Sequence, residues 1–127
     1  MPLAWILLGA LAGAALARAA LGRRASGRVL ALGLVVAASI HVVISALAGV
    51  PAWIATDLAG VVLFGALAWR GVSRPAWMAV AWGLHPLWDL GMHLATAAPG
   101  RETYAWFCLG VDLAVAATLF TSIDRDS

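Results

Sequence analysis

Three polar side chains repeat at intervals of four residues within an otherwise apolar segment. His85, Asp89 and His93 lie in the stretch WGLHPLWDLGMH, which covers residues 82–93. On an α-helix each step of four residues turns only about 40° around the axis, so the three side chains form one polar stripe. Imidazole nitrogens and carboxylate oxygens are ligands that suit zinc or iron better than calcium. The spacing therefore predicts half of a metal site, to be completed by an acid from another helix.

The composition of the chain is that of a membrane protein. Of the 127 residues, 64% are hydrophobic and only 11% are charged, and lysine is absent. Soluble domains carry about 25% charged residues. The arginines flank apolar runs and do not form a patch with aromatic residues, which excludes nucleic-acid binding. We expect one integral membrane domain that spans residues 1–127.

Apolar runs and helix breakers predict an all-α bundle with about five transmembrane helices. The segment 29–69 would be about 60 Å long as one helix, twice the hydrocarbon core of about 30 Å, so it must turn once, and Pro51 suits the start of the next helix. A cleaved signal peptide is the alternative for the first run, but no positive side chain precedes that run. The predicted spans lie near residues 3–21, 29–49, 52–69, 76–95 and 104–122.

The distribution of arginines predicts the orientation of these spans. Only Arg101 falls in the loops on one side, within the predicted loop 96–103. Positive side chains are enriched in cytoplasmic loops. We therefore expect a multi-pass protein of the cell membrane, in contact with the lipid bilayer, with its N-terminus outside and its C-terminus in the cytoplasm. A GxxxG match from Gly9 to Gly13 indicates tight helix packing and, more weakly, a homo-oligomer. The arginines of the opposite loops are Arg23, Arg24, Arg28, Arg70 and Arg74.

The polar side chains within the spans fall at a shared depth. A rise of about 1.5 Å per residue places them in the outer half of the membrane or at its centre, and they come from four different helices. A buried carboxylate costs about 2.5–3.5 kcal/mol, so we interpret them as one cluster that is open to the outer side. Asp89 and Asp112 are the candidate catalytic acids. The candidate metal ligands are His85, Asp89, His93, Asp112, Asp57 and Cys108.

Structural roles remain open for several of these residues. His41, between Ile40 and Val42, fits a hydrogen-bonded core histidine better than a ligand. Asp57 is close enough to the outer end of its helix to be a solvated first-turn acid, and His93 could simply cap a helix end. Cys108 has no second cysteine to pair with, and it is also compatible with the role of a small buried hydrophobic residue.

The second half of the chain resembles the domain-of-unknown-function family 6010, a family of small bacterial integral membrane proteins. The resemblance covers about residues 50 to 120. It depends on an acid early in the third span, an Arg-Gly pair after that span, a W-x-x-H-x-x-W-D-x-x-x-H pattern and a later C-x-x-x-D pattern. The family supplies no activity. The matching residues in this chain are Asp57, Arg70, Gly71, Trp82, His85, Trp88, Asp89, His93, Cys108 and Asp112.

Three kinds of function suit such a cluster. A bound zinc or iron could activate water for the hydrolysis of a lipid-like or other small-molecule substrate. A relay that needs no metal could move protons or ions between carboxylates and imidazoles. A haem could be held between His41 and His85, which lie at similar depth, although Asp89 would then sit beside an apolar macrocycle. We expect metal binding, with the relay and haem binding as alternatives.

Overall fold

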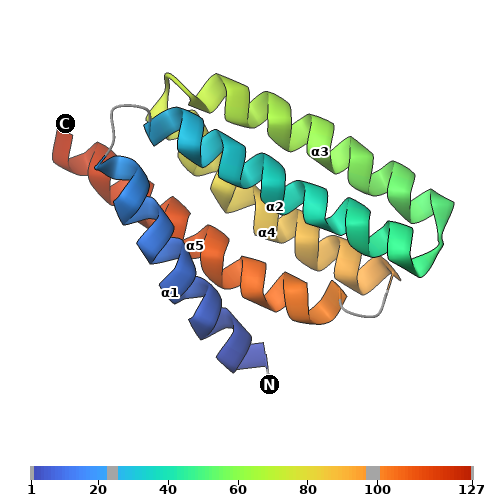
Figure 1. Cartoon of the computed structure of the whole chain (residues 1–127). Coiled ribbons are helices and arrows are strands. Elements are labelled where there is room, and N and C mark those ends of the chain that lie inside the picture. The colour runs from blue at the N-terminus through green and yellow to red at the C-terminus, as the bar shows by residue number, and fades with distance from the viewer. Residues whose placement is uncertain (1, 23–25, 97–100, 127) are drawn as a thin grey trace.

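The structure consists of five α-helices joined by short connections. It is a computed structural model that describes residues 2–22, 26–96 and 101–126, with side chains described up to residue 92 in the second segment and residue 122 in the third. The predicted all-α bundle is confirmed within these ranges (Figure 1). The helices are α1 (Pro2–Leu21), α2 (Ser26–Ala48), α3 (Pro51–Gly71), α4 (Pro75–Thr96) and α5 (Arg101–Asp126).

Prolines and a glycine set the helix ends near the predicted positions. Pro51 and Pro75 are the first residues of α3 and α4, where a missing backbone N–H removes no helical hydrogen bond. Gly49 follows α2 with a φ of 74°, a left-handed conformation that glycine adopts without strain. One prediction was wrong, because the connection before α5 is shorter than the predicted loop 96–103. Arg101 is already helical, and its buried ion pair with α3 accounts for the early start of α5.

The helices pack so that neighbours in sequence are mostly neighbours in space. Figure 1 shows α2, α3 and α4 running side by side, with α1 crossing obliquely over α5. The bundle has two ends, which we name by their residues. The polar end contains the start of α1, the α2–α3 turn at Gly49 and the start of α5. The arginine end contains the start of α2 with Arg28 and the α3–α4 turn with Arg70 and Arg74.

Apolar side chains cover the outside of the bundle. Leu47 is 84% exposed, and Leu11 and Val62 are each 72% exposed. Contact between such a surface and water is unfavourable, whereas contact with the hydrocarbon of a bilayer is favourable. In the described part of the chain, α1, α2, α3 and α5 are long and apolar enough to cross a membrane. The remaining helix, α4, has 22 residues and packs between α3 and α5 with His85, Pro86 and Asp89 in it.

The interior of the bundle differs between its two ends. At the polar end the buried groups include imidazoles, carboxylates and a guanidinium. Toward the arginine end the buried core of the described residues is apolar, as expected for a tightly packed helix bundle. The side chains of that apolar core include Leu30, Leu34, Phe64, Ala68, Met78, Trp82, Val115 and Leu119.

Glycines bring α1 and α5 into close backbone contact. A Cβ added at Gly9 would overlap the carbonyl oxygen of Phe107, and one added at Gly110 would overlap that of Ile6. Gly13 faces the backbone of Val111 in the same way. The GxxxG match therefore serves tight packing within one chain, and α5 covers the face that a dimer would need.

Candidate functional site

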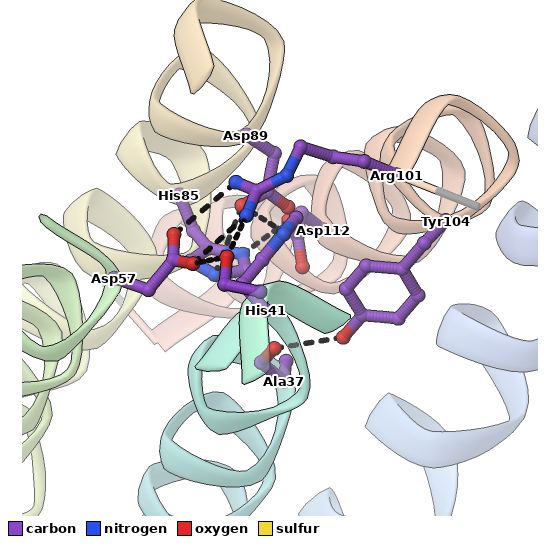
Figure 2. Close-up of polar contacts among 9 residues, drawn as sticks. Ala37, His41, Asp57, His85, Asp89, Arg101, Tyr104 and Asp112 are labelled. Atoms are coloured by element: carbon purple, nitrogen blue, oxygen red, sulfur yellow. Dashed lines mark hydrogen bonds and ion pairs between the residues drawn. The ribbon is translucent and has the colours of Figure 1, made fainter. Parts of the chain in front are cut away.

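Polar side chains from four helices converge inside the polar end. Figure 2 shows His41 of α2, Asp57 of α3, His85 and Asp89 of α4, and Arg101 and Asp112 of α5 pointing toward one another. Each of them is at most 2% exposed. Ionisable groups are rarely so deeply buried without partners. The predicted cluster therefore exists as a geometric feature of the structure, but its predicted opening to the outer side was wrong, because these side chains are buried.

Two histidines and two aspartates form a continuous series of contacts, which we call the His–Asp chain. The Nδ1 atom of His85 lies 2.7 Å from Asp112 Oδ2 in a hydrogen bond. The other ring nitrogen, His85 Nε2, lies 3.5 Å from Asp89 Oδ1, one helical turn away on α4. The same Asp89 oxygen lies 2.8 Å from His41 Nε2 of α2. The order of contacts is therefore Asp112, His85, Asp89 and His41.

Much of the hydrogen-bonding capacity of the His–Asp chain is unused. Both Asp89 oxygens, Asp112 Oδ1 and His85 Nε2 are buried without an aligned hydrogen bond among the described residues. The short contact of His41 Nε2 with Asp89 is close enough for an ion pair, but its N–H direction does not meet hydrogen-bond geometry. A buried polar group without a partner costs about 1–3 kcal/mol. Apart from His41 Nε2, these atoms all belong to His85, Asp89 and Asp112.

A second group lies closer to the polar end than the His–Asp chain, and we call it the arginine triad. The Arg101 guanidinium donates from Nη2 to Asp57 Oδ2 at 2.8 Å and from Nη1 to Asp57 Oδ1 at 3.2 Å. Ser45 accepts a short hydrogen bond from Arg101 Nη2 and donates another to Asp57. The forked geometry matches a carboxylate with two parallel hydrogen bonds. The triad ties together the polar-end portions of α2, α3 and α5.

Aromatic side chains enclose the His–Asp chain. The ring of Phe64 stands edge-on to His85, with centroids 4.9 Å apart. The Tyr104 ring stands in the same manner against His41 at 4.8 Å, and its hydroxyl donates to the Ala37 carbonyl oxygen at 2.7 Å. Cys108 is buried beside Tyr104. These contacts hold the two imidazoles in fixed orientations.

The predicted ligands divide into three sets. His85, Asp89 and Asp112 have ligand atoms that all lie within 4.8 Å of one another. Asp57 is engaged by the arginine triad, and Cys108 faces Tyr104, so neither offers a free ligand atom to this set. The side chain of His93 lies outside the described residues.

Sequence reasoning missed part of the site. His41, interpreted as a hydrogen-bonded core histidine, is buried and lies 2.8 Å from Asp89, so it belongs to the site although it was not a predicted ligand. Arg101 was assigned to a loop, and Ser45 was not considered, although both are fully buried. One signal was available: Arg101, Tyr104, Cys108 and Asp112 follow one another at helical spacing of three or four residues. That periodicity places them on one face of a helix that starts at residue 101.

The fold and the site together define a class: a multi-pass helical membrane protein with a buried His/Asp centre near one end of the bundle. The model of DUF6010, a family of unknown function, matches residues 3–124, so the chain belongs to this family. The match includes the first fifty residues and therefore His41 and Ser45, which the resemblance seen in the sequence did not cover. No curated protein and no solved structure matches the chain.

Proposed function

We propose that the chain binds one divalent transition metal, zinc or iron, at His85 and Asp89, with Asp112 holding the histidine in place. The supporting observation is the position of the two His85 nitrogens. When His85 is neutral and donates from Nδ1 to Asp112, its Nε2 carries a lone pair. That lone pair faces Asp89 Oδ1 at 3.5 Å. Two electron-rich atoms face each other favourably when a cation lies between them.

The distances fit a metal site in which Asp112 orients the histidine. Ligand atoms bound to one tetrahedral zinc at about 2.0–2.1 Å lie about 3.3 Å apart. The separation of His85 Nε2 and Asp89 Oδ1, 3.5 Å, is close to this value. The 2.7 Å contact of His85 Nδ1 with Asp112 is a hydrogen bond, typical of the carboxylates that hold metal-binding histidines in place.

The chemistry that we propose for this site is the hydrolysis of a lipid-like molecule. A bound zinc or iron polarises a carbonyl or phosphoryl oxygen and makes water more acidic. The chain's own residues would position that chemistry: Asp89 contributes a carboxylate oxygen, and Asp112 holds His85 in one tautomer. His41 contacts Asp89 from the opposite side and limits where that carboxylate can point.

The alternative is a relay without metal, and one observation favours it. Each buried acid has its own basic partner, with Asp57 next to Arg101, Asp89 next to His41 and Asp112 next to His85. Protonated imidazoles would make this set neutral without any metal. However, a transmembrane relay needs a polar path through the whole bundle. The described core between Asp112 and the arginine end is apolar, so the series of polar side chains does not continue through the whole bundle.

The haem alternative has less support. His41 Nε2 and His85 Nε2 both approach the same oxygen of Asp89, at 2.8 Å and 3.5 Å. The carboxylate thus occupies the space between the two imidazoles in which the iron and its macrocycle would lie. We therefore do not include haem in the proposal.

The same proposal includes a location and an orientation. We propose a cell-membrane protein with the polar end outside and the arginine end in the cytoplasm. Arg28, Arg70 and Arg74 all lie at the arginine end, whereas Arg101 is neutralised by Asp57 inside the bundle. Only the arginine end therefore presents free positive charge, which is the feature that the positive-inside bias recognises.

Metal binding can be tested by stability in detergent. Chelator-treated protein is melted with and without added zinc or ferrous iron, because a ligand at 100 times its dissociation constant stabilises by about 2.7 kcal/mol. Asp89→Asn should abolish this stabilisation, since it removes the charge and keeps the shape. Ser45→Ala is the matched control, because Ser45 is buried in the neighbouring triad and should leave the metal effect intact. No metal effect in the wild type would favour the relay.

A further inference from the structure

The His–Asp chain has no exposure of its own, so anything that reaches it must pass a covering side chain. Its four members are at most 2% exposed. Among the residues around it, Tyr104 is half-buried, and Figure 2 shows it beside His41. One side of its ring meets His41, and its hydroxyl spans from α5 to the Ala37 carbonyl of α2. Tyr104 is therefore a half-buried side chain in direct contact with the His–Asp chain.

An apolar groove lies next to Tyr104. It is lined by Trp5 of α1 and by Thr103, Tyr104 and Phe107 of α5. The groove sits at the polar end, where α1 crosses α5 and packs little against α2. Trp5 is 41% exposed, so the groove is open to the surroundings of the bundle.

We propose that this groove binds the hydrocarbon chain of an amphiphile from the adjacent membrane leaflet, and that Tyr104 separates this molecule from the His–Asp chain. The proposal rests on the proposed function for the identity of the reacting centre and adds the class of its substrate. Apolar and aromatic walls favour a hydrocarbon chain, and Thr103 at the rim offers a hydroxyl to a polar head. The polar head would then lie next to Tyr104, the residue that contacts His41.

A photoreactive lipid tests this proposal without any need for metal. The protein is reconstituted into phosphatidylcholine vesicles that contain a trace of phosphatidylcholine with a diazirine on one acyl chain. After irradiation, the labelled residues are identified by peptide mass spectrometry. In the wild type, labelling of Trp5 and Phe107 should exceed that of Leu58 several-fold, although Leu58 is 49% exposed and Trp5 only 41%. Excess lysophosphatidylcholine should suppress the labelling of the groove and leave Leu58 unchanged.

Variants of Tyr104 test its role as the wall between the groove and the His–Asp chain. Tyr104→Ala should let the label reach Cys108, which is 3% exposed and lies behind the tyrosine. Tyr104→Phe keeps the ring and should leave Cys108 unlabelled. Phe120→Ala is the matched control, because it removes an exposed aromatic ring from the same helix at the other end. If Tyr104→Ala does not fold, Tyr104→Leu replaces it.

Two results would overturn the proposal. The groove would be ordinary bilayer-facing surface if Trp5 and Phe107 were labelled no more than Leu58. Tyr104 would not be the wall if Cys108 stayed unlabelled in a folded Tyr104→Ala or Tyr104→Leu protein, or became labelled equally in Phe120→Ala. Since carbene labelling needs no metal, a metal-free protein could still pass this test. A metal-loaded protein could equally fail it.

Discussion

Asp89 and Asp112 lie on opposite sides of the His85 ring, and their contacts give them different roles. Asp112 holds Nδ1 through a 2.7 Å hydrogen bond, whereas Asp89 faces Nε2 at 3.5 Å. In the proposed site Asp89 is a direct ligand, and Asp112 mainly orients the histidine. Residues that orient a metal ligand usually raise metal affinity by about 10- to 100-fold.

This division predicts graded effects of single substitutions on metal affinity. Asp112→Asn should weaken binding by about 10- to 100-fold while one metal per chain still binds at saturation, because an amide can still accept from His85 Nδ1. His41→Ala should also weaken binding without abolishing it, since His41 contacts Asp89 and not the proposed metal position. The measurement is competition with a chromophoric chelator. A wild-type affinity in both variants would mean that neither residue supports the site.

The arginine triad leads to a prediction about stability. Arg101→Gln should destabilise the bundle by about 3–5 kcal/mol, because it leaves the Asp57 carboxylate buried without its partner. Adding Asp57→Asn should restore much of that loss, since no unpaired charge then remains. The free energy of unfolding in detergent is measured for both single variants and the double variant, which gives the coupling between the two residues. Additive effects would show that the ion pair is not coupled in the folded protein.

The sequence predicted the acids of the site better than their partners. His85, Asp89 and Asp112 stand out because a carboxylate or imidazole inside an apolar run is costly and needs an explanation. Arg101 and Ser45 gave no such signal, because an arginine beside Pro99 and Gly100 resembles an ordinary loop residue and a serine is common in membrane helices. Their roles depend on which helices meet at the polar end. Periodicity within one helix carries no such information.

At the scale of the helices, the packing of the bundle depends on where the backbones of two helices can approach each other closely. Gly49, Pro51 and Pro75 predicted the end of α2 and the starts of α3 and α4 to within one residue, because these residues act locally. The pairing of α1 with α5 could not be predicted in this way. It depends on Gly9, Gly13 and Gly110 meeting complementary backbone on a helix that is distant in sequence.

A glycine substitution tests this helix contact. Gly110→Val should destabilise the protein by about 1–3 kcal/mol, since its side chain would overlap the Ile6 carbonyl and push α1 away from α5. Gly65→Ala is the control, because nothing lies within 4 Å of a Cβ added there. Alanine also favours a helix over glycine, so this variant should be as stable as the wild type or more so. Equal melting temperatures for Gly110→Val and the wild type would contradict the close α1–α5 packing.

At the scale of the whole molecule, an apolar exterior and a half-polar interior imply that the two membrane faces are not equivalent. The His–Asp chain lies toward the polar end, and free arginines gather at the arginine end. A fluorescent reporter fused to the C-terminus should be active, because we expect this terminus in the cytoplasm. A periplasmic phosphatase fused at the same position should be inactive. The opposite pair of results would place the polar end in the cytoplasm and reverse the side from which the groove at Tyr104 is reached.

The elemental content of the protein, purified without chelators, tests the central claim most directly. The account predicts about one zinc or iron per chain in the wild type and little or none in His85→Ala, because His85 Nε2 is the proposed nitrogen ligand. Ser45→Ala, purified in parallel, should contain as much metal as the wild type. A folded wild-type protein without metal, or His85→Ala with an undiminished content, would contradict the proposed metal site.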